Sequence, residues 1–169
     1  MNINKFLPSE SYTLTTKLSV DQVRARIQDI TGPKLDLGFF TSPKNNSLKP
    51  YEGSISGNSF NISRVINYGN SFLPVITGAI SSYAGRTDVK IDMRLAAFVR
   101  IFVLIFLGLI GFSIIIHIFL FARNLPAKSS FSLLISFIAF IFCVLLTYFA
   151  FKKESTISKQ FLAKLLEEE

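Results

Sequence analysis

The residues that most often carry chemistry are few in this chain, and they are badly placed to work together. The only histidine, His117, and the only cysteine, Cys143, both lie inside long apolar runs. A protein metal site needs at least three ligands in register, and nucleophilic catalysis needs a nucleophile beside a base. The sequence supports neither kind of site, so we expect no metal and no cofactor.

Acid–base chemistry finds no better support. Asp88 and Asp92 lie on either side of Lys90 on the polar side of an expected strand, a pattern typical of a solvated surface. No glycine spacing matches a phosphate-binding loop. His117 is ionisable and lies in an apolar run, which makes it a functional candidate. Neither run contains an acidic residue to pair with it, so a neutral imidazole near the outer end is the simpler interpretation. We therefore expect a protein that is not an enzyme.

Basic and amide side chains offer a different chemistry, the binding of a partner or of lipid. The formal net charge is +7, and the basic residues are spread along the chain, which favours anionic headgroups over nucleic acid. Residues 66–76 contain two asparagines and a tyrosine before Phe-Leu-Pro, more than a turn requires. These asparagines could bond to the backbone at a corner or bind a polar group of a partner. The candidate residues for lipid or partner binding are Arg64, Asn67, Asn70, Lys90, Arg94 and Arg100.

The elements that must position these side chains are organised around two apolar runs, residues 101–122 and 131–151. Neither contains Asp, Glu, Lys or Arg, and about twenty helical residues cross a hydrocarbon core of roughly 30 Å. The sequence therefore predicts a transmembrane helical hairpin joined by residues 123–130. Small residues let helices approach closely in lipid, so we expect them to face the other helix or, alternatively, a second copy of the chain. The candidates for helix packing are Gly108, Gly111, Ser132, Ser136, Ala139, Cys143 and Thr147.

The residues before the hairpin are enough for one small domain with its own core. Residues 12–17 alternate like a strand, and Ser19 with Gln22 has the spacing of a capping box, which predicts a helix that ends at residues 31–33. Four strands in series are predicted after residue 50, with a hairpin turn at Gly57-Asn58 between the first two and the clearest alternation at residues 88–95. The prediction is an α+β fold, an antiparallel meander sheet with one or two covering helices, followed by the hairpin.

Two further segments have more than one interpretation. Residues 34–50 have loop composition, and Phe39 and Phe40 are predicted either to cap the domain core or to anchor it at the membrane surface. Residues 152–169 predict an amphipathic helix that ends in three glutamates, so its last turn should fray. It could lie on the membrane, but docking on the sheet is favoured because one short helix cannot cover four or five strands. Its apolar stripe is expected to comprise Ile157, Phe161 and Leu165, widened by Leu162 and Leu166.

The charges near the hairpin predict its orientation. The N-terminus has no basic cluster followed by an apolar stretch, so we expect no signal peptide. Five basic residues flank the hairpin on the domain side and two lie in its connection, which predicts that both termini are cytoplasmic. The five are Arg94, Arg100, Lys152, Lys153 and Lys159, and the two are Arg123 and Lys128.

Three segments together resemble a known group of proteins: Tyr51-Glu52-Gly53, residues 66–76, and Ile91-Asp92-Met93-Arg94-Leu95. The group consists of small bacterial membrane proteins with a β-rich N-terminal domain, two membrane helices and a charged helical tail. The resemblance covers most of the chain. It implies this architecture and a bacterial source, and it implies no activity. We therefore expect the membrane to be the bacterial inner membrane. The chain is also similar, more loosely, to bacterial pleckstrin-homology-like membrane proteins, although its helix after Ser19 comes earlier than in that pattern.

The sequence thus predicts three parts: a cytoplasmic α+β domain (1–95), a transmembrane hairpin (96–151) and an amphipathic C-terminal helix (152–169). We expect a non-enzymatic integral membrane protein whose membrane-apposed domain binds a protein partner or anionic lipid headgroups. The alternative is an accessory subunit of a larger membrane complex that acts through its hairpin. A second copy of the chain is a further possible partner, and nucleic acid is not expected.

Overall fold

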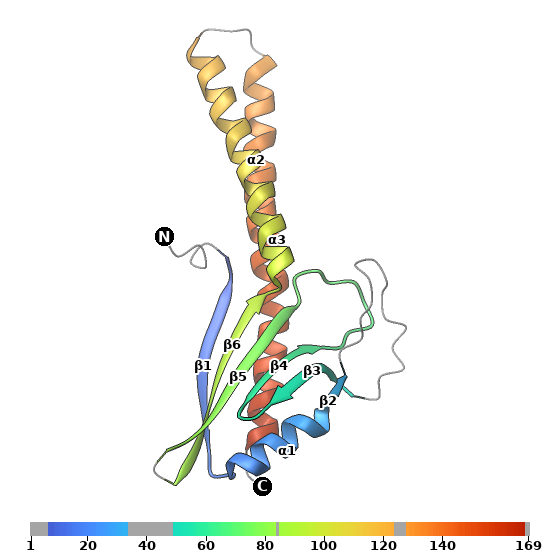
Figure 1. Ribbon diagram of the computed structural model, residues 1–169. Coiled ribbons are helices and arrows are strands. Elements are labelled where there is room, and N and C mark those ends of the chain that lie inside the picture. Colours follow the sequence, from blue (N-terminus) through green and yellow to red (C-terminus); the bar gives the residue numbers. More distant parts are fainter. Residues whose placement is uncertain (1–6, 34–48, 84, 124–127, 168–169) are drawn as a thin grey trace.

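The computed structural model describes residues 7–33, 49–83, 85–123 and 128–167. Within them the chain forms an α+β fold with two long apolar helices at its C-terminal end (Figure 1). The elements in chain order are β1 (Ser9–Thr16), α1 (Val20–Ile30), β2 (Thr31–Pro33), β3 (Tyr51–Ser56), β4 (Ser59–Arg64), β5 (Pro74–Tyr83), β6 (Arg86–Leu95), α2 (Ala97–Ala122) and α3 (Lys128–Leu166). Phe39 and Phe40, with their two predicted roles, lie outside the described residues.

The strands form one sheet in the order β1-β6-β5-β4-β3-β2. Strands β3 to β6 make the predicted antiparallel meander, and Gly57 turns the first hairpin with a φ of +55°. The sheet is nevertheless mixed, because β2 pairs with β3 in parallel. The sequence predicts only a helix end at Thr31–Pro33. In the structure, Thr31 is extended and its hydroxyl donates to the Ile27 carbonyl, so the helix closes and the chain enters the sheet at once.

One face of the sheet carries the hydrophobic core, and α1 and α3 cover it (Figure 1). Strand β6 shows why: its odd-numbered residues from Val89 to Leu95 are buried, while the charged residues between them face the opposite side. Helix α1 contributes Val23 and Ile27, which are fully buried. It begins with the predicted capping box between Ser19 and Gln22.

Helix α3 runs without a break from Lys128 to Leu166. The sequence predicts a separate helix after residue 151, but the structure continues the second apolar run directly into the helix that packs on the sheet. Its end is held in place, because Arg26 donates to the carbonyls of Leu165 and Glu167 at 2.7 and 2.9 Å, and Thr16 donates to that of Leu166 at 2.8 Å. These bonds satisfy carbonyls that a helix end leaves open.

The face of α3 that meets the sheet differs from the predicted apolar stripe. Leu162 and Leu166 are buried as expected, but Ile157 and Phe161 are 37% and 38% exposed. The buried positions follow on from Phe151 at helical spacing and include polar side chains: Phe151, Glu154, Ser155, Ser158, Leu162 and Leu166. Because the helix is continuous, the face it presents to the sheet is set by where it enters the domain, and not by its apolar residues alone.

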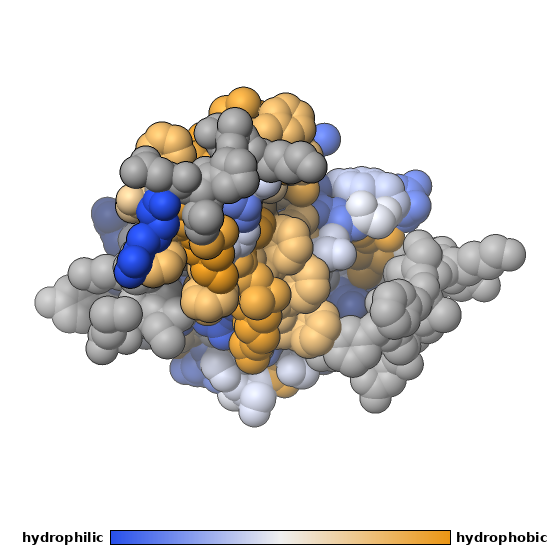
Figure 2. Space-filling view, turned by 90° about the horizontal axis from the view of Figure 1, so that it is seen from above, coloured by the Kyte–Doolittle hydropathy of each residue, from blue (hydrophilic) through white to orange (hydrophobic). Residues whose placement is uncertain are grey.

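Helix α2 begins two residues after the end of β6, so the sheet leads almost directly into the hairpin. Both α2 and α3 are long and apolar enough to cross a membrane. Their large side chains point outward, and Phe112, Phe131 and Phe149 are more than 60% exposed. Seen end-on, apolar side chains gather over the hairpin (Figure 2). Such a surface is stable in hydrocarbon, where the helices satisfy their own backbone groups.

Candidate functional site

The six residues predicted to bind lipid or a partner lie in separate parts of the domain. Arg64 and Asn70 lie at the junction between the sheet and α3, beside the buried Glu154. Asn67 is exposed in the connection between β4 and β5, and Arg100 lies in the first turn of α2. The remaining two, Lys90 and Arg94, are exposed on the sheet face opposite the core.

Glu154 is the centre of a buried polar cluster at the start of the sheet-facing part of α3. Its side chain is only 1% exposed. One carboxylate oxygen, Oε2, accepts from Arg64 Nε at 3.1 Å and from Arg64 Nη2 at 2.6 Å, and the other accepts from the hydroxyl of Tyr68. Arg64 Nη2 also reaches the Tyr68 hydroxyl at 2.8 Å. This cluster ties the connection between β4 and β5 to α3.

The electrostatics of the cluster favour the ion pair. Burial opposes ionisation of Glu154, but the hydrogen bonds from Tyr68 and Arg64 outweigh it and lower the pKa of Glu154 below its ordinary value. The same hydrogen bond to Glu154 raises the pKa of Tyr68. Asn70 is also occupied, since its side-chain oxygen accepts from the backbone N–H of Phe72 at 3.0 Å. Arg64 and Asn70 therefore hold the fold together and are not available to a ligand.

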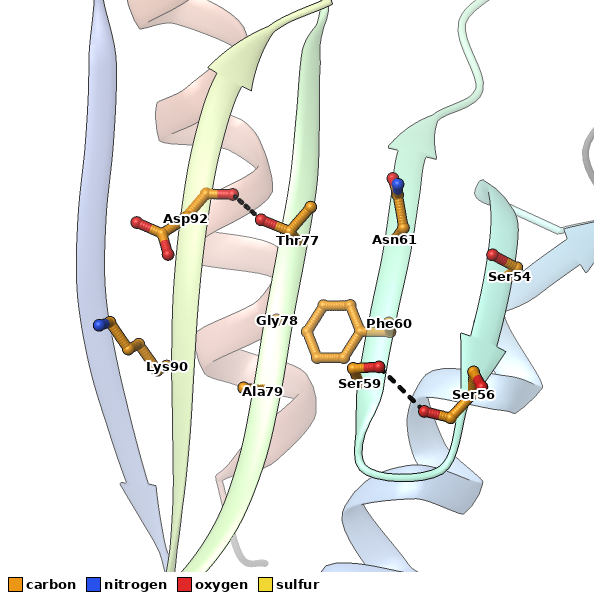
Figure 3. Close-up of a pocket in the computed structure, with 10 residues that line it drawn as sticks. All are labelled: Ser54, Ser56, Ser59, Phe60, Asn61, Thr77, Gly78, Ala79, Lys90 and Asp92. Carbon is orange, nitrogen blue, oxygen red and sulfur yellow. Dashed lines mark hydrogen bonds between the residues drawn. The ribbon is translucent and has the colours of Figure 1, made fainter. Parts of the chain in front are cut away.

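The outer face of the sheet is a better candidate for a binding surface. A hollow of about 470 Å³ lies across strands β3 to β6, and small polar side chains surround it (Figure 3). The residues that line it are Ser54, Ser56, Ser59, Phe60, Asn61, Thr77, Gly78, Ala79, Lys90 and Asp92. Hydroxyls, an amide, an ammonium and a carboxylate can together recognise a polar surface by hydrogen bonds.

The acidic groups on this face are held by neighbouring hydroxyls, whereas the cations project. Ser11 of β1 donates to Asp92, and Thr15 donates to Asp88 at 2.7 Å. Lys90 and Arg94 alternate with these acids along β6 and are both exposed. The nearest approach between Arg94 and Asp92 is 3.8 Å, across an exposed pair that contributes little to stability. Along β6 the outer face thus presents three exposed cations, Arg86, Lys90 and Arg94, which alternate with the two hydroxyl-bonded carboxylates.

Gly78 and Phe60 both line the hollow, and the ring of Phe60 lies next to Gly78 (Figure 3). A Cβ at position 78 would lie 2.0 Å from Phe60 Cζ, and Phe60 is itself buried. We expect Gly78→Ala to lower the free energy of unfolding by about 1–3 kcal/mol, because the ring has to move within a packed core. Thermal unfolding of the full chain in mild detergent measures this. Adding Phe60→Leu, which shortens the clashing side chain, should recover part of the loss; no recovery would show that another contact is responsible.

The predicted helix-packing residues divide into two groups. On α3, Ser132, Ser136, Ala139 and Cys143 are partly buried and Thr147 is buried, and Ser136 lies 3.5 Å from Ser113 of α2 between their hydroxyl oxygens. On α2, a Cβ at Gly108 or Gly111 would meet no atom within 4 Å. The glycines therefore do not mark the closest approach of the two helices.

His117 bonds within its own helix. Its Nδ1 lies 2.7 Å from the Ser113 carbonyl oxygen, one turn earlier on α2. Among the described residues, no group of three or more His, Cys, Asp or Glu side chains is arranged to hold a metal ion.

The sequence alone assigns no role to Glu154 or to Glu10, which accepts from Lys152 and Lys159 in the structure, and it marks Tyr68 only as part of residues 66–76. Glu154 follows two lysines, but it lies one turn after Phe151 on the side that the structure buries. That spacing is the signal in the sequence that could have identified Glu154.

No model of a known protein family matches the chain, and no curated protein matches it either.

Proposed function

We propose that this chain is a non-enzymatic integral membrane protein whose sheet domain binds a protein partner through its outer face. The observation that carries the proposal is the asymmetry of the sheet. Helices α1 and α3 cover one face, while among the described residues no element covers the other, which is polar and hollowed over β3 to β6. A sheet needs only one covered face for its core, so the open face is free for recognition.

The geometry favours a protein over the bilayer as the occupant of this face. Strands β1, β5 and β6 run roughly along the axis of the hairpin, so this part of the outer face is roughly parallel to the membrane normal and does not lie flat on the lipid (Figure 1). Small side chains such as Ser54, Ser59 and Thr77 lose little side-chain entropy when a partner orders them. Lys90 and Arg94 add electrostatic steering toward a partner with acidic groups.

The membrane helices fix where this face is displayed. We place the domain on the cytoplasmic side of a bacterial inner membrane, because basic residues dominate that end of the hairpin and because of the resemblance described above. The unbroken α3 and the short link between β6 and α2 support a domain held firmly at the bilayer.

The proposal is tested by comparing the proteins that bind to the full-length wild-type chain, to a double variant and to a control variant. Tagged protein is extracted in mild detergent, and bound proteins are quantified by mass spectrometry. Asn61→Arg with Thr77→Arg fills the hollow with bulk and charge, and Gln28→Arg is the control on the exposed side of α1. We expect the double variant to lose the specific partner by about tenfold or more and the control to retain it.

A partner that the double variant binds as well as the wild-type chain does would contradict the proposal. Binding would then belong to the hairpin, which is the alternative function of an accessory subunit.

A further inference from the structure

A second hollow lies at the base of the hairpin, away from the outer face of the sheet. Its volume is about 250 Å³, and it is bounded by three parts of the chain. The residues that shape it are Leu7 and Pro8 before β1, Val103 and Leu107 of α2, and Val144 and Thr147 of α3. Leu7, Val103 and Thr147 are buried, whereas Val144 and Tyr148 are 41% and 49% exposed, so the hollow is open on one side.

The depth of this hollow determines what surrounds it. Val103 and Leu107 belong to the first two turns of the first apolar run, and Val144 belongs to the last two turns of the second. In a membrane-spanning hairpin these positions lie in the outermost part of the hydrocarbon layer, just inside the headgroups. Acyl chains are the local solvent there, and an apolar hollow that opens to them is a place for one such chain.

A cationic group lies directly next to the hollow on the headgroup side. Glu10, two residues after Pro8, accepts from Lys152 Nζ at 3.0 Å and from Lys159 Nζ at 3.1 Å. Burial opposes ionisation of Glu10, but the two ammonium groups outweigh it and lower its pKa. Two positive charges therefore share one negative charge, which leaves the group with a net positive charge.

The two parts are connected along α3. Lys152 follows Tyr148, which also lines the hollow, by one helical turn or about 6 Å. Lys159 lies further from the membrane, with its Nζ 4.7 Å from the centre of the Tyr12 ring. Lys152 and Lys159 are each about half exposed, so both can reach a further anion while they remain bonded to Glu10.

We infer that this hollow and the adjoining lysines bind one anionic phospholipid, with an acyl chain between Leu7, Val103 and Val144 and its phosphate on Lys152 and Lys159. A free anion would need the lysines alone and leaves the packed apolar hollow without a role. A helix of a second protein molecule does not fit, because the hollow has room for no more than one acyl chain or one side chain. The inference rests on the proposed membrane-spanning hairpin, and it does not depend on the proposed protein partner, which occupies a different face.

Native mass spectrometry of the full-length chain in mild detergent tests the inference. Phosphatidylglycerol and phosphatidylcholine with identical acyl chains are the two probes. We expect one phosphatidylglycerol molecule per chain, retained about tenfold more strongly than phosphatidylcholine. Lys152→Gln with Lys159→Gln should remove this preference, and Lys152→Arg with Lys159→Arg should keep it. The matched control is Lys153→Gln, which removes one neighbouring exposed charge.

The hollow is tested separately. Val144→Phe should fill it and weaken the retention of both lipids by about fivefold or more, whereas Leu145→Phe, one residue on and similarly exposed, should not. If Lys153→Gln matches the effect of the Lys152 and Lys159 changes, the attraction is unspecific and the inference is wrong. It is equally wrong if inorganic phosphate displaces the lipid and Val144→Phe has no effect, because the site would then bind only an anion.

Discussion

Replacing Arg64 with methionine is expected to lower the free energy of unfolding by about 3–5 kcal/mol. Glu154 is 1% exposed and receives two hydrogen bonds from Arg64. Methionine keeps much of the side-chain length but leaves the carboxylate buried with only neutral partners, the Tyr68 hydroxyl and the Asn70 side chain. A buried charge without a counter-charge is the main cause of the loss.

Glu154→Gln is expected to be milder, at about 1–3 kcal/mol. A glutamine oxygen can still accept from Arg64, and the Arg64 side chain, 22% exposed, can reach water for its remaining bonds. A larger loss in the free energy of unfolding for Arg64→Met than for Glu154→Gln would show that the buried carboxylate needs its cation. A surface salt bridge would not show this difference. Losses below about 1 kcal/mol in both would show that the pair is effectively solvated.

The same pair predicts a pH dependence. Because the folded pKa of Glu154 is lowered, its ionised form stabilises the fold fully above the pKa of an unfolded glutamate, about 4.3. That contribution is lost as pH falls through the folded pKa. Thermal unfolding in mild detergent should therefore show wild-type stability decreasing toward acid more steeply than that of Glu154→Gln, so that the two curves converge. Parallel curves over this range would contradict the assignment.

The sheet could be predicted from the sequence where neighbouring strands pair through short turns. The alternation at residues 88–95 and the Gly57-Asn58 turn are local signals, and the structure confirms both. Strand β2 could not be found in this way. It is three residues long, contains Gly32 and Pro33, and pairs in parallel with β3 across a long connection. Parallel pairing of distant segments leaves no periodic pattern in a segment so short.

The polar junction was beyond sequence reasoning for a related reason. Apolar periodicity assigns the buried face of a helix from its hydrophobic residues, and on α3 this selects Ile157 and Phe161. Burial of Glu154 becomes favourable only because Arg64 and Tyr68, far away in the chain, supply a counter-charge and a hydroxyl. The outer-face cations Lys90 and Arg94 were identified correctly as exposed, because strand alternation alone decides which way they point.

Gly53→Ala is expected to lower the free energy of unfolding by about 2–4 kcal/mol, because it combines a strained backbone with a clash. Gly53 lies in β3 opposite Ile62 with a φ of +153°. A Cβ there would lie 2.1 Å from the backbone oxygen of Asn61. The obstacle is part of the ladder between β3 and β4, so it cannot rotate away as a side chain would.

Gly57→Ala is the matched control, because Gly57 also has a positive φ, +55°, but its Cβ would meet no atom within 4 Å. It should lower the free energy of unfolding only by the cost of a positive φ in alanine, about 1–2 kcal/mol. The excess loss in Gly53→Ala, measured by thermal unfolding in the same detergent, then isolates the clash with β4. Equal losses in the two variants would mean that β3 can move away from Asn61. In that case Gly53 would be required for its backbone conformation alone, and not for the close pairing of β3 with β4.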